Sequence, residues 1–343
     1  MRKIIASLLC LAMAFSMAAA PTFAEKEHEL TKAEKIVMNM GIISKEDYSY
    51  DSEVTRGEFA KIIVDMLRIG DSEREMEKWQ ESTKGEDKTT EELQVKKSVF
   101  QDVDESHPYC YEIEMVKSKG IMNGVSSSKF APEYGITVRE ATKVIVDLAG
   151  YSMQADINGG YPNGYQAVAT EMGLTKNVSG DFSDVITKSA LAQVIYNAFN
   201  VEMMELKMDA TNGAAFEFSD ETFLTGIMNM ERLRAKVTDN GFASVSGESF
   251  VGEGKITVGG LELILPDEFL YAIDYIGQDV ELFYTNDLEE ENRVTSIELA
   301  DDEAVTFDIK DFEKFNGTSI TYLENGRTVT KNINKNAELI LNN

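Results

Sequence analysis

The chain has 343 residues, with 60 Asp and Glu against 33 Lys and Arg, so its formal net charge is −27. At about 100–200 residues per domain this length predicts two or three domains, and a hydrophobic content of 43% is enough for each to have a core. The acidity argues against nucleic acid as a partner, because phosphate binding requires clustered Lys and Arg. With two Cys, two His and one Trp, we expect no metal site and no cofactor.

Residues 1–24 have the pattern of a secretory signal peptide. Arg2 and Lys3 precede an apolar run over residues 4–20, and small residues follow as far as Ala24. The alternative is a retained membrane anchor, but the run is shorter than the roughly 20 residues that span a bilayer, and no later segment is apolar enough to span one. We therefore expect export, cleavage after Ala24 and no membrane span in the mature chain.

Three later segments share a Thr that opens a helical pattern: Thr55, Thr137 and Thr187. Apolar residues follow each Thr at the fourth, seventh, eighth and eleventh positions, a spacing that gives a helix one apolar stripe. Glu58 and Glu140 lie three residues after the first two Thr, which predicts a capping box at each helix start. Ala190 stands at this position in the third segment, so its cap is expected to be weaker.

A second helical pattern precedes each Thr and ends at a Gly followed by Ile or Leu: Gly41, Gly120 and Gly173. Such a Gly ends a helix in the left-handed conformation, so each segment predicts helix, loop, helix. Residues 71–98, between the first two segments, are dense in Glu, Lys, Ser and Thr, and we expect a mobile, solvated insertion that contains Trp79 as an exposed aromatic residue.

The middle segment carries a recognisable order of short motifs: Phe100-Gln101-Asp102-Val103, His107-Pro108-Tyr109, Gly120-Ile121-Met122-Asn123-Gly124, Phe130-Ala131-Pro132 and Ile136-Thr137. The first segment adds a Thr-Arg-x-Glu motif at residues 55–58, and the third adds Gly-Gly-Tyr-Pro-Asn-Gly-Tyr at residues 159–165. These residues resemble the surface-layer homology (SLH) family of bacterial cell-surface proteins, and the third segment resembles clostridial members. The resemblance covers about residues 30–201.

The resemblance implies a pseudo-threefold helical module of three SLH repeats whose grooves bind a wall-linked anionic polysaccharide, often one bearing pyruvate ketals. The residue after each N-cap Thr lies on the first helical turn, where backbone N–H groups and the helix dipole favour an anion. Arg56 adds a donor fork suited to a carboxylate, and Lys188 adds a point charge. The alternative is that both cations only solvate helix ends, and as an exposed cation Arg56 is expected to contribute little to folding.

The second repeat departs from this pattern. Val138 occupies the cation position, and Arg139 follows one residue later, about 100° further around the helix. We therefore expect Arg56, Lys188, Thr55 and Thr187 to bind the polysaccharide, with Arg139 as a weak contributor.

From about residue 207 the pattern becomes that of a small β-rich module. We predict a short helix over residues 220–232, and then strands joined by Asn-Gly and Gly-Gly turns. The predicted strands are 235–238, 255–258, 261–265, 280–284, 293–299, 304–309, 319–323, 327–331 and 338–341. Cys110 is expected to be a small core residue and His107 a loop or helix-entry residue, since neither has a partner at metal-ligand spacing.

The predicted fold class is α+β and multidomain: an N-terminal all-α pseudo-threefold module of three helix-loop-helix repeats and a C-terminal β-rich module. The predicted ranges are a signal peptide at 1–24, SLH repeats at 25–70, 99–150 and 151–203, the insertion at 71–98 and the β-rich region at 204–343.

Two classes of function fit these predictions. The first is a noncatalytic anchor at the cell surface, held on the wall polysaccharide and contacting other surface-layer proteins. The alternative is an envelope polysaccharide-processing enzyme, or a fragment of a longer one, with the SLH repeats as its attachment part. Glycoside hydrolysis needs two positioned carboxylates in a sizeable cleft, and the short strands of the β-rich region leave little room for one.

Overall fold

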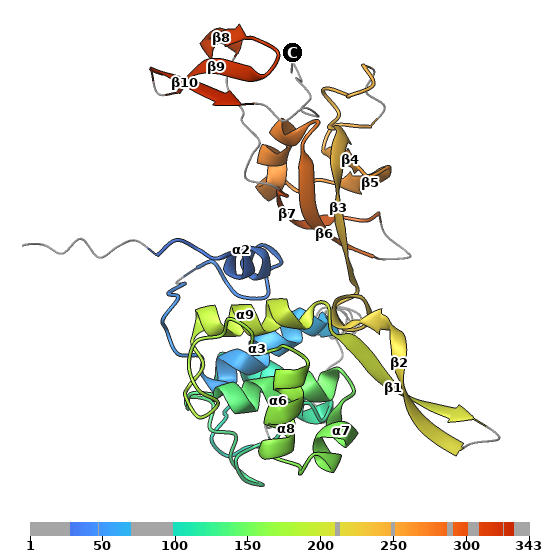
Figure 1. Cartoon of the computed structure of the whole chain (residues 1–343). Helices are drawn as coiled ribbons and strands as arrows, with labels where there is room; N and C mark the ends of the chain where they lie inside the picture. Colours follow the sequence, from blue (N-terminus) through green and yellow to red (C-terminus); the bar gives the residue numbers. More distant parts are fainter. Residues whose placement is uncertain are drawn as a thin grey trace, which may run out of the picture. The chain divides into compact units, whose positions relative to one another are not determined.

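The computed structural model describes residues 28–46, 48–69, 99–209, 213–247, 251–286, 291–300, 309–324 and 326–332. It is a mixed α+β structure in which helices precede strands along the chain (Figure 1). The predicted signal peptide, the predicted insertion with Trp79 and the strand predicted at 338–341 lie outside the described residues. So does the strand predicted at 304–309 except for Ile309, which begins a 3₁₀ turn.

The helices are α2 (Lys32–Asn39), α3 (Arg56–Leu67), α5 (Cys110–Ser118), α6 (Val138–Leu148), α7 (Ser152–Ile157), α8 (Asn163–Glu171) and α9 (Lys188–Ala198). They include the predicted helix before and after each loop, as α2 and α3, α5 and α6, and α8 and α9. Gly41, Gly120 and Gly173 follow the first helix of each pair with φ of 74°, 71° and 74°. This is the left-handed conformation that the sequence predicted. Helix α7 was not predicted, nor was the 3₁₀ segment Asp267–Tyr275.

A threonine caps the second helix of each pair. Thr55, Thr137 and Thr187 each accept a hydrogen bond on the side chain from the backbone N–H three residues on. The reciprocal bond of a full capping box forms at Glu140. The box predicted at Thr55 is only half formed, because the carboxylate of Glu58 contacts Lys188 instead.

The residues before the three caps join in a closed ring of backbone hydrogen bonds. The N–H of Val54 donates to the carbonyl of Ile186, that of Ile186 to Ile136, and that of Ile136 to Val54, each at 2.9 Å. All three residues are buried. Each donates one bond and accepts one, so these buried backbone groups are satisfied only when all three segments are present.

The strands form three antiparallel sheets. A hairpin pairs β1 (Glu202–Asp209) with β2 (Gly213–Thr222). A five-stranded sheet has the order β5-β4-β3-β6-β7 and consists of β3 (Met230–Asp239), β4 (Lys255–Val258), β5 (Leu261–Ile264), β6 (Asp279–Thr285) and β7 (Val294–Leu299). A three-stranded sheet pairs β10 (Arg327–Asn332), β9 (Ser319–Glu324) and β8 (Phe312–Phe315) in that order. The five-stranded sheet and the 3₁₀ segment Asp267–Tyr275 share one apolar core, which includes Val237, Ile256, Phe269 and Leu282.

The helix predicted over residues 220–232 is wrong. Strand β2 continues to Thr222, one π-helical turn spans Phe223–Ile227, and β3 begins at Met230. The N–H of Met228 donates to the carbonyl of Phe223, five residues earlier, at 3.3 Å, which closes one π-helical turn, and both side chains are buried.

Candidate functional site

Arg56 begins α3 and lies at the centre of the candidate site. Its Nε donates to the carbonyl of Phe130 at 3.0 Å and its Nη2 to the carbonyl of Asn123 at 2.8 Å. The guanidinium carbon lies 4.9 Å from the centre of the Phe130 ring, and Arg56 is only 7% exposed. The expectation of an exposed cation was therefore wrong, because the loop between Asn123 and Phe130 folds over the first turn of α3.

The charge of Arg56 also acts on Glu140 of α6. Its Nη1 lies 3.8 Å from Oε1 of Glu140, while Oε2 of the same carboxylate accepts the backbone N–H of Thr137 at 2.9 Å. Burial lowers the pKa of Arg56, and the negative charge of Glu140 opposes this shift. Glu140 thus both caps α6 and balances a buried cation of α3.

Lys188 makes the corresponding contact at the start of α9. Its Nζ lies 3.1 Å from Oε1 of Glu58 on α3, and the two side chains are 15% and 22% exposed. Each of these two contacts forms a junction between a cation on the first turn of one helix and an acid on the first turn of another. At the third junction, between α6 and α9, Val138 stands where the cation would be and Ala190 where the acid would be, and both are buried. The second segment therefore lacks its cation at the same junction where the third segment lacks its acid. This match becomes visible only when the segments are compared in space.

Arg139 lies one position further along α6 and is half-buried. Its Nε donates to the carbonyl of Phe182 at 3.2 Å, and its backbone N–H donates to the same oxygen at 3.0 Å. The structure therefore does not bring Arg139 into the position that Arg56 holds in α3.

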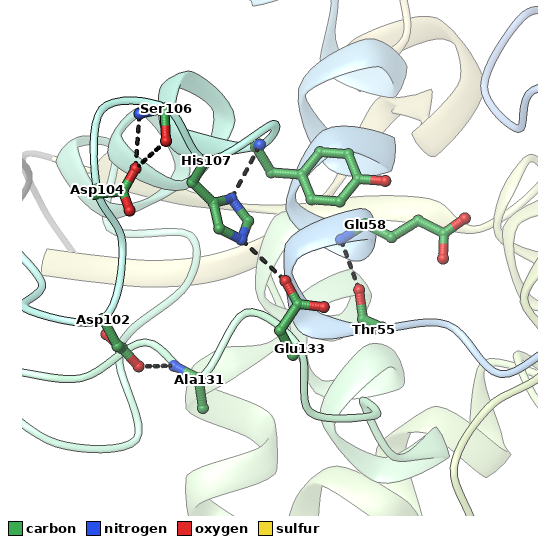
Figure 2. Close-up of polar contacts among 9 residues, drawn as sticks. Thr55, Glu58, Asp102, Asp104, Ser106, His107, Ala131 and Glu133 are labelled. Carbon is green, nitrogen blue, oxygen red and sulfur yellow. Dashed lines mark hydrogen bonds and ion pairs between the residues drawn. The ribbon is translucent and has the colours of Figure 1, made fainter.

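Figure 2 shows the loops around His107, which precedes α5 as predicted. The backbone N–H of Tyr109 donates to Nδ1 of His107, so Nε2 carries the proton and donates to Glu133 at 3.1 Å. Asp102 accepts the backbone N–H groups of Phe130 and Ala131 at 2.9 and 2.8 Å. Burial raises the pKa of Asp102, but these bonds outweigh it and leave that pKa below its usual value. These contacts fix the loop that covers Arg56.

Cys110, the first residue of α5, is half-buried rather than part of the core. Burial and the nearby Glu114 raise its pKa, which disfavours the reactive thiolate. No group of His, Cys, Asp and Glu suited to a metal ion occurs within the described ranges. Of the helices in those same ranges, none has the length and apolar character needed to cross a membrane.

Comparison with known proteins agrees with this geometry. Residues 99–141 match the S-layer homology domain, a stretch that contains α5, its loop and the cap of α6. The chain is 22% identical to the middle cell wall protein of Brevibacillus brevis over 84% of its own length and 28% of that relative. It is 22% identical to the surface layer protein of Brevibacillus choshinensis, over 90% of this chain and 28% of the relative. It is also 21% identical to the cell surface protein of Thermoanaerobacter kivui, over 74% of this chain and 29% of the relative.

The chain therefore spans less than a third of the length of each of these relatives. The matched domain and the relatives together support a location at the cell surface, in the cell wall. The S-layer homology match at residues 99–141 thus lies within a chain that is similar to surface-layer and cell-wall proteins.

Proposed function

We propose that the chain is a noncatalytic anchor that holds its protein on an anionic wall polysaccharide through three SLH repeats at residues 25–70, 99–150 and 151–203. The family match covers the middle repeat. The observation that carries the proposal is the ring of hydrogen bonds joining Val54, Ile136 and Ile186. Each segment donates one bond and accepts one, as expected for three equivalent parts of one module. The Gly-Gly-Tyr-Pro motif at residues 159–162 supports a clostridial type for the third repeat.

The candidate ligand residues remain Arg56, Lys188, Thr55 and Thr187, with Arg139 as a weaker contributor. Both cations lie on the first turn of a capped helix, where the helix dipole adds to their attraction for a carboxylate. Lys188 is the more accessible of the two, and a polymer carboxylate would share it with Glu58. Arg56 would contribute mainly through the electrostatic attraction of its positive charge, and by hydrogen bonds that hold the loop between Asn123 and Phe130 beside the site. The further partners that we propose are other surface-layer proteins, since one of the relatives is named a surface layer protein.

The test is co-sedimentation of the mature protein with purified wall sacculi, before and after chemical removal of the wall polysaccharide. We expect binding to intact sacculi and its loss after stripping. Equal binding to stripped sacculi would show that the peptidoglycan is the ligand, and the proposed polymer would then be wrong. Hydrolysis of the polymer during the incubation, measured as released reducing sugar, would overturn the noncatalytic part of the proposal.

A further inference from the structure

A cavity of about 350 Å³ lies where five elements of the fold end or begin. It is lined by residues at the ends of α2, α3 and β6 and at the starts of β3 and β7. Its apolar walls include Met40, Ile42, Val64 and Met230, of which the last three are buried. The volume is within the range of small-molecule sites in proteins, about 300–1,000 Å³. Within the described residues, this lining shares no member with the candidate polysaccharide site.

Two arginines line the same cavity. Arg68 follows α3, Arg293 precedes β7, and both are exposed. Among the residues that the structure describes, neither guanidinium has an ion pair or a hydrogen bond. The acid in the lining, Asp65, is already paired with Lys61. The cavity therefore combines apolar walls with two unpaired positive charges, in a chain whose formal net charge is −27.

The backbone of each arginine is held in place. The N–H of Arg293 donates to the hydroxyl of Thr285 at 3.0 Å, and the N–H of Thr285 donates to the carbonyl of Arg293 at 3.0 Å. Arg68 ends α3 in the left-handed conformation, with φ of 53° and ψ of 23°. This conformation favours Gly and costs free energy for a residue with a side chain. An arginine at such a position indicates a use for its side chain.

We propose that this cavity binds a small amphipathic carboxylate, whose apolar group packs on Met40, Ile42 and Val64 and whose carboxylate binds Arg68 and Arg293. A guanidinium offers a planar fork of donors that matches the two oxygens of a carboxylate. The flexible side chain of Met40 can adapt to the shape of the apolar group. Two sources supply this chemistry: the carboxyl terminus of a short apolar peptide and the carboxylate of a short acyl chain.

The experiment measures binding of two probes to the mature protein by isothermal titration calorimetry. The probes are the peptide N-acetyl-alanyl-leucine with a free carboxylate, and octanoate. The amide of the same peptide is the ligand control. We expect the carboxylate to be required, so that an amide binds at least tenfold more weakly than its acid, because its charge-assisted hydrogen bonds are lost. Binding of the peptide alone would identify a peptide terminus as the source, and binding of octanoate alone would identify an acyl chain.

Three variants test the assigned residues. Arg68→Gly and Arg293→Gln are each expected to weaken binding about tenfold. Arg68→Gly should nevertheless melt at the wild-type temperature or above it, because Gly suits the left-handed conformation. Met40→Trp should abolish binding by filling the cavity. Arg327→Gln is the matched control, since Arg327 is also exposed but lies on β10, outside the cavity lining.

The proposal is overturned if the wild-type chain binds neither acid, or if it binds the peptide amide as tightly as the free acid. Wild-type affinity in both Arg68→Gly and Arg293→Gln would also overturn it. Both variants should bind wall sacculi as the wild type does, so a loss of sacculus binding in either one would assign the cavity to the anchor instead. If the wild-type chain fails to bind sacculi, the anchor proposal fails, while the cavity proposal is decided by the calorimetry alone.

Discussion

A cation on the first turn of a helix can stabilise the fold, bind a ligand or do both, and the surroundings of Arg56 and Lys188 differ in this respect. Arg56 is buried and donates to the backbone carbonyls of Phe130 and Asn123, far away in the sequence. Lys188 is more accessible and makes a single ion pair with Glu58. The sequence places both at equivalent positions, and only the structure distinguishes them.

Replacing Arg56 with Ala is expected to destabilise the protein by about 2–4 kcal/mol, because two carbonyls lose their donor and the space over Phe130 is emptied. The measurement is the free energy of unfolding by urea. Lys61→Ala is the control on the same helix, since the half-buried Lys61 pairs with Asp65 one turn away, a contact worth about 0.2–0.5 kcal/mol. Equal losses in the two variants would contradict a structural role for Arg56.

Lys188→Ala should leave unfolding within about 1 kcal/mol of wild type, because it removes one partly exposed ion pair. Binding to wall sacculi should weaken, since the most accessible cation of the candidate site is lost. Glu58→Gln is the informative partner variant: it keeps the backbone N–H that Thr55 accepts and removes the acid that competes for Lys188. We expect Glu58→Gln to bind as well as wild type or better. Weaker binding in Glu58→Gln would mean that the ion pair, and not a free Lys188, is what the site requires.

At the scale of elements, short sequence patterns predicted most of the helices and strands whose formation depends on neighbouring residues. The helices α3, α6 and α9 follow from their apolar stripes and Thr caps, and strands β4 and β5 follow from alternation on either side of Gly259-Gly260. Strand β1 was missed because its Met, Glu, Leu and Lys residues favour helices, and its pairing with β2 overrides that preference. The burial of Arg56 was missed because it depends on Asn123 and Phe130, which are far away in the sequence.

Strand β6 carries a buried acid that forms ion pairs with cations on β3 and α2. Glu281 is only 4% exposed and contacts both Arg232 on β3 and Lys32 on α2. Burial raises the pKa of Glu281, but the hydrogen bond from Lys32 and the charge of Arg232 outweigh it, so the pKa lies below its usual value. A carboxyl whose pKa is lowered by folding stabilises the fold in its ionised form.

The stability from Glu281 should therefore be fully present above its unfolded pKa and should decline as the pH falls below about 4.5 toward the lower folded pKa. Glu281→Gln should melt at a lower temperature at pH 7, because it leaves two cations without their buried partner, and should lose part of the acid dependence. Melting curves from pH 3 to 7 measure both effects. Glu291→Gln is the control, because that exposed acid pairs with Lys255 on the surface. The same acid slope in both variants would contradict the assignment.

At the scale of the whole molecule, charge governs the approach to an anionic wall. The chain carries a formal net charge of −27, so it and an anionic polymer repel each other at long range. Moderate salt screens this repulsion before it weakens contacts at close range. Binding to sacculi should therefore hold or strengthen from low to moderate salt and fall only at higher salt. A steep loss of binding from the lowest salt upward would instead indicate a broad cationic surface.

Three similar helix pairs in one chain could in principle close their ring in a wrong order. The junctions are not interchangeable: Arg56 faces Glu140, Lys188 faces Glu58, and the third junction has only Val138 and Ala190. A ring closed in another order would set a buried cation against an apolar side chain, and a buried charge without its partner costs about 3–5 kcal/mol. The junction without charges thus allows the three helix pairs only one order of assembly.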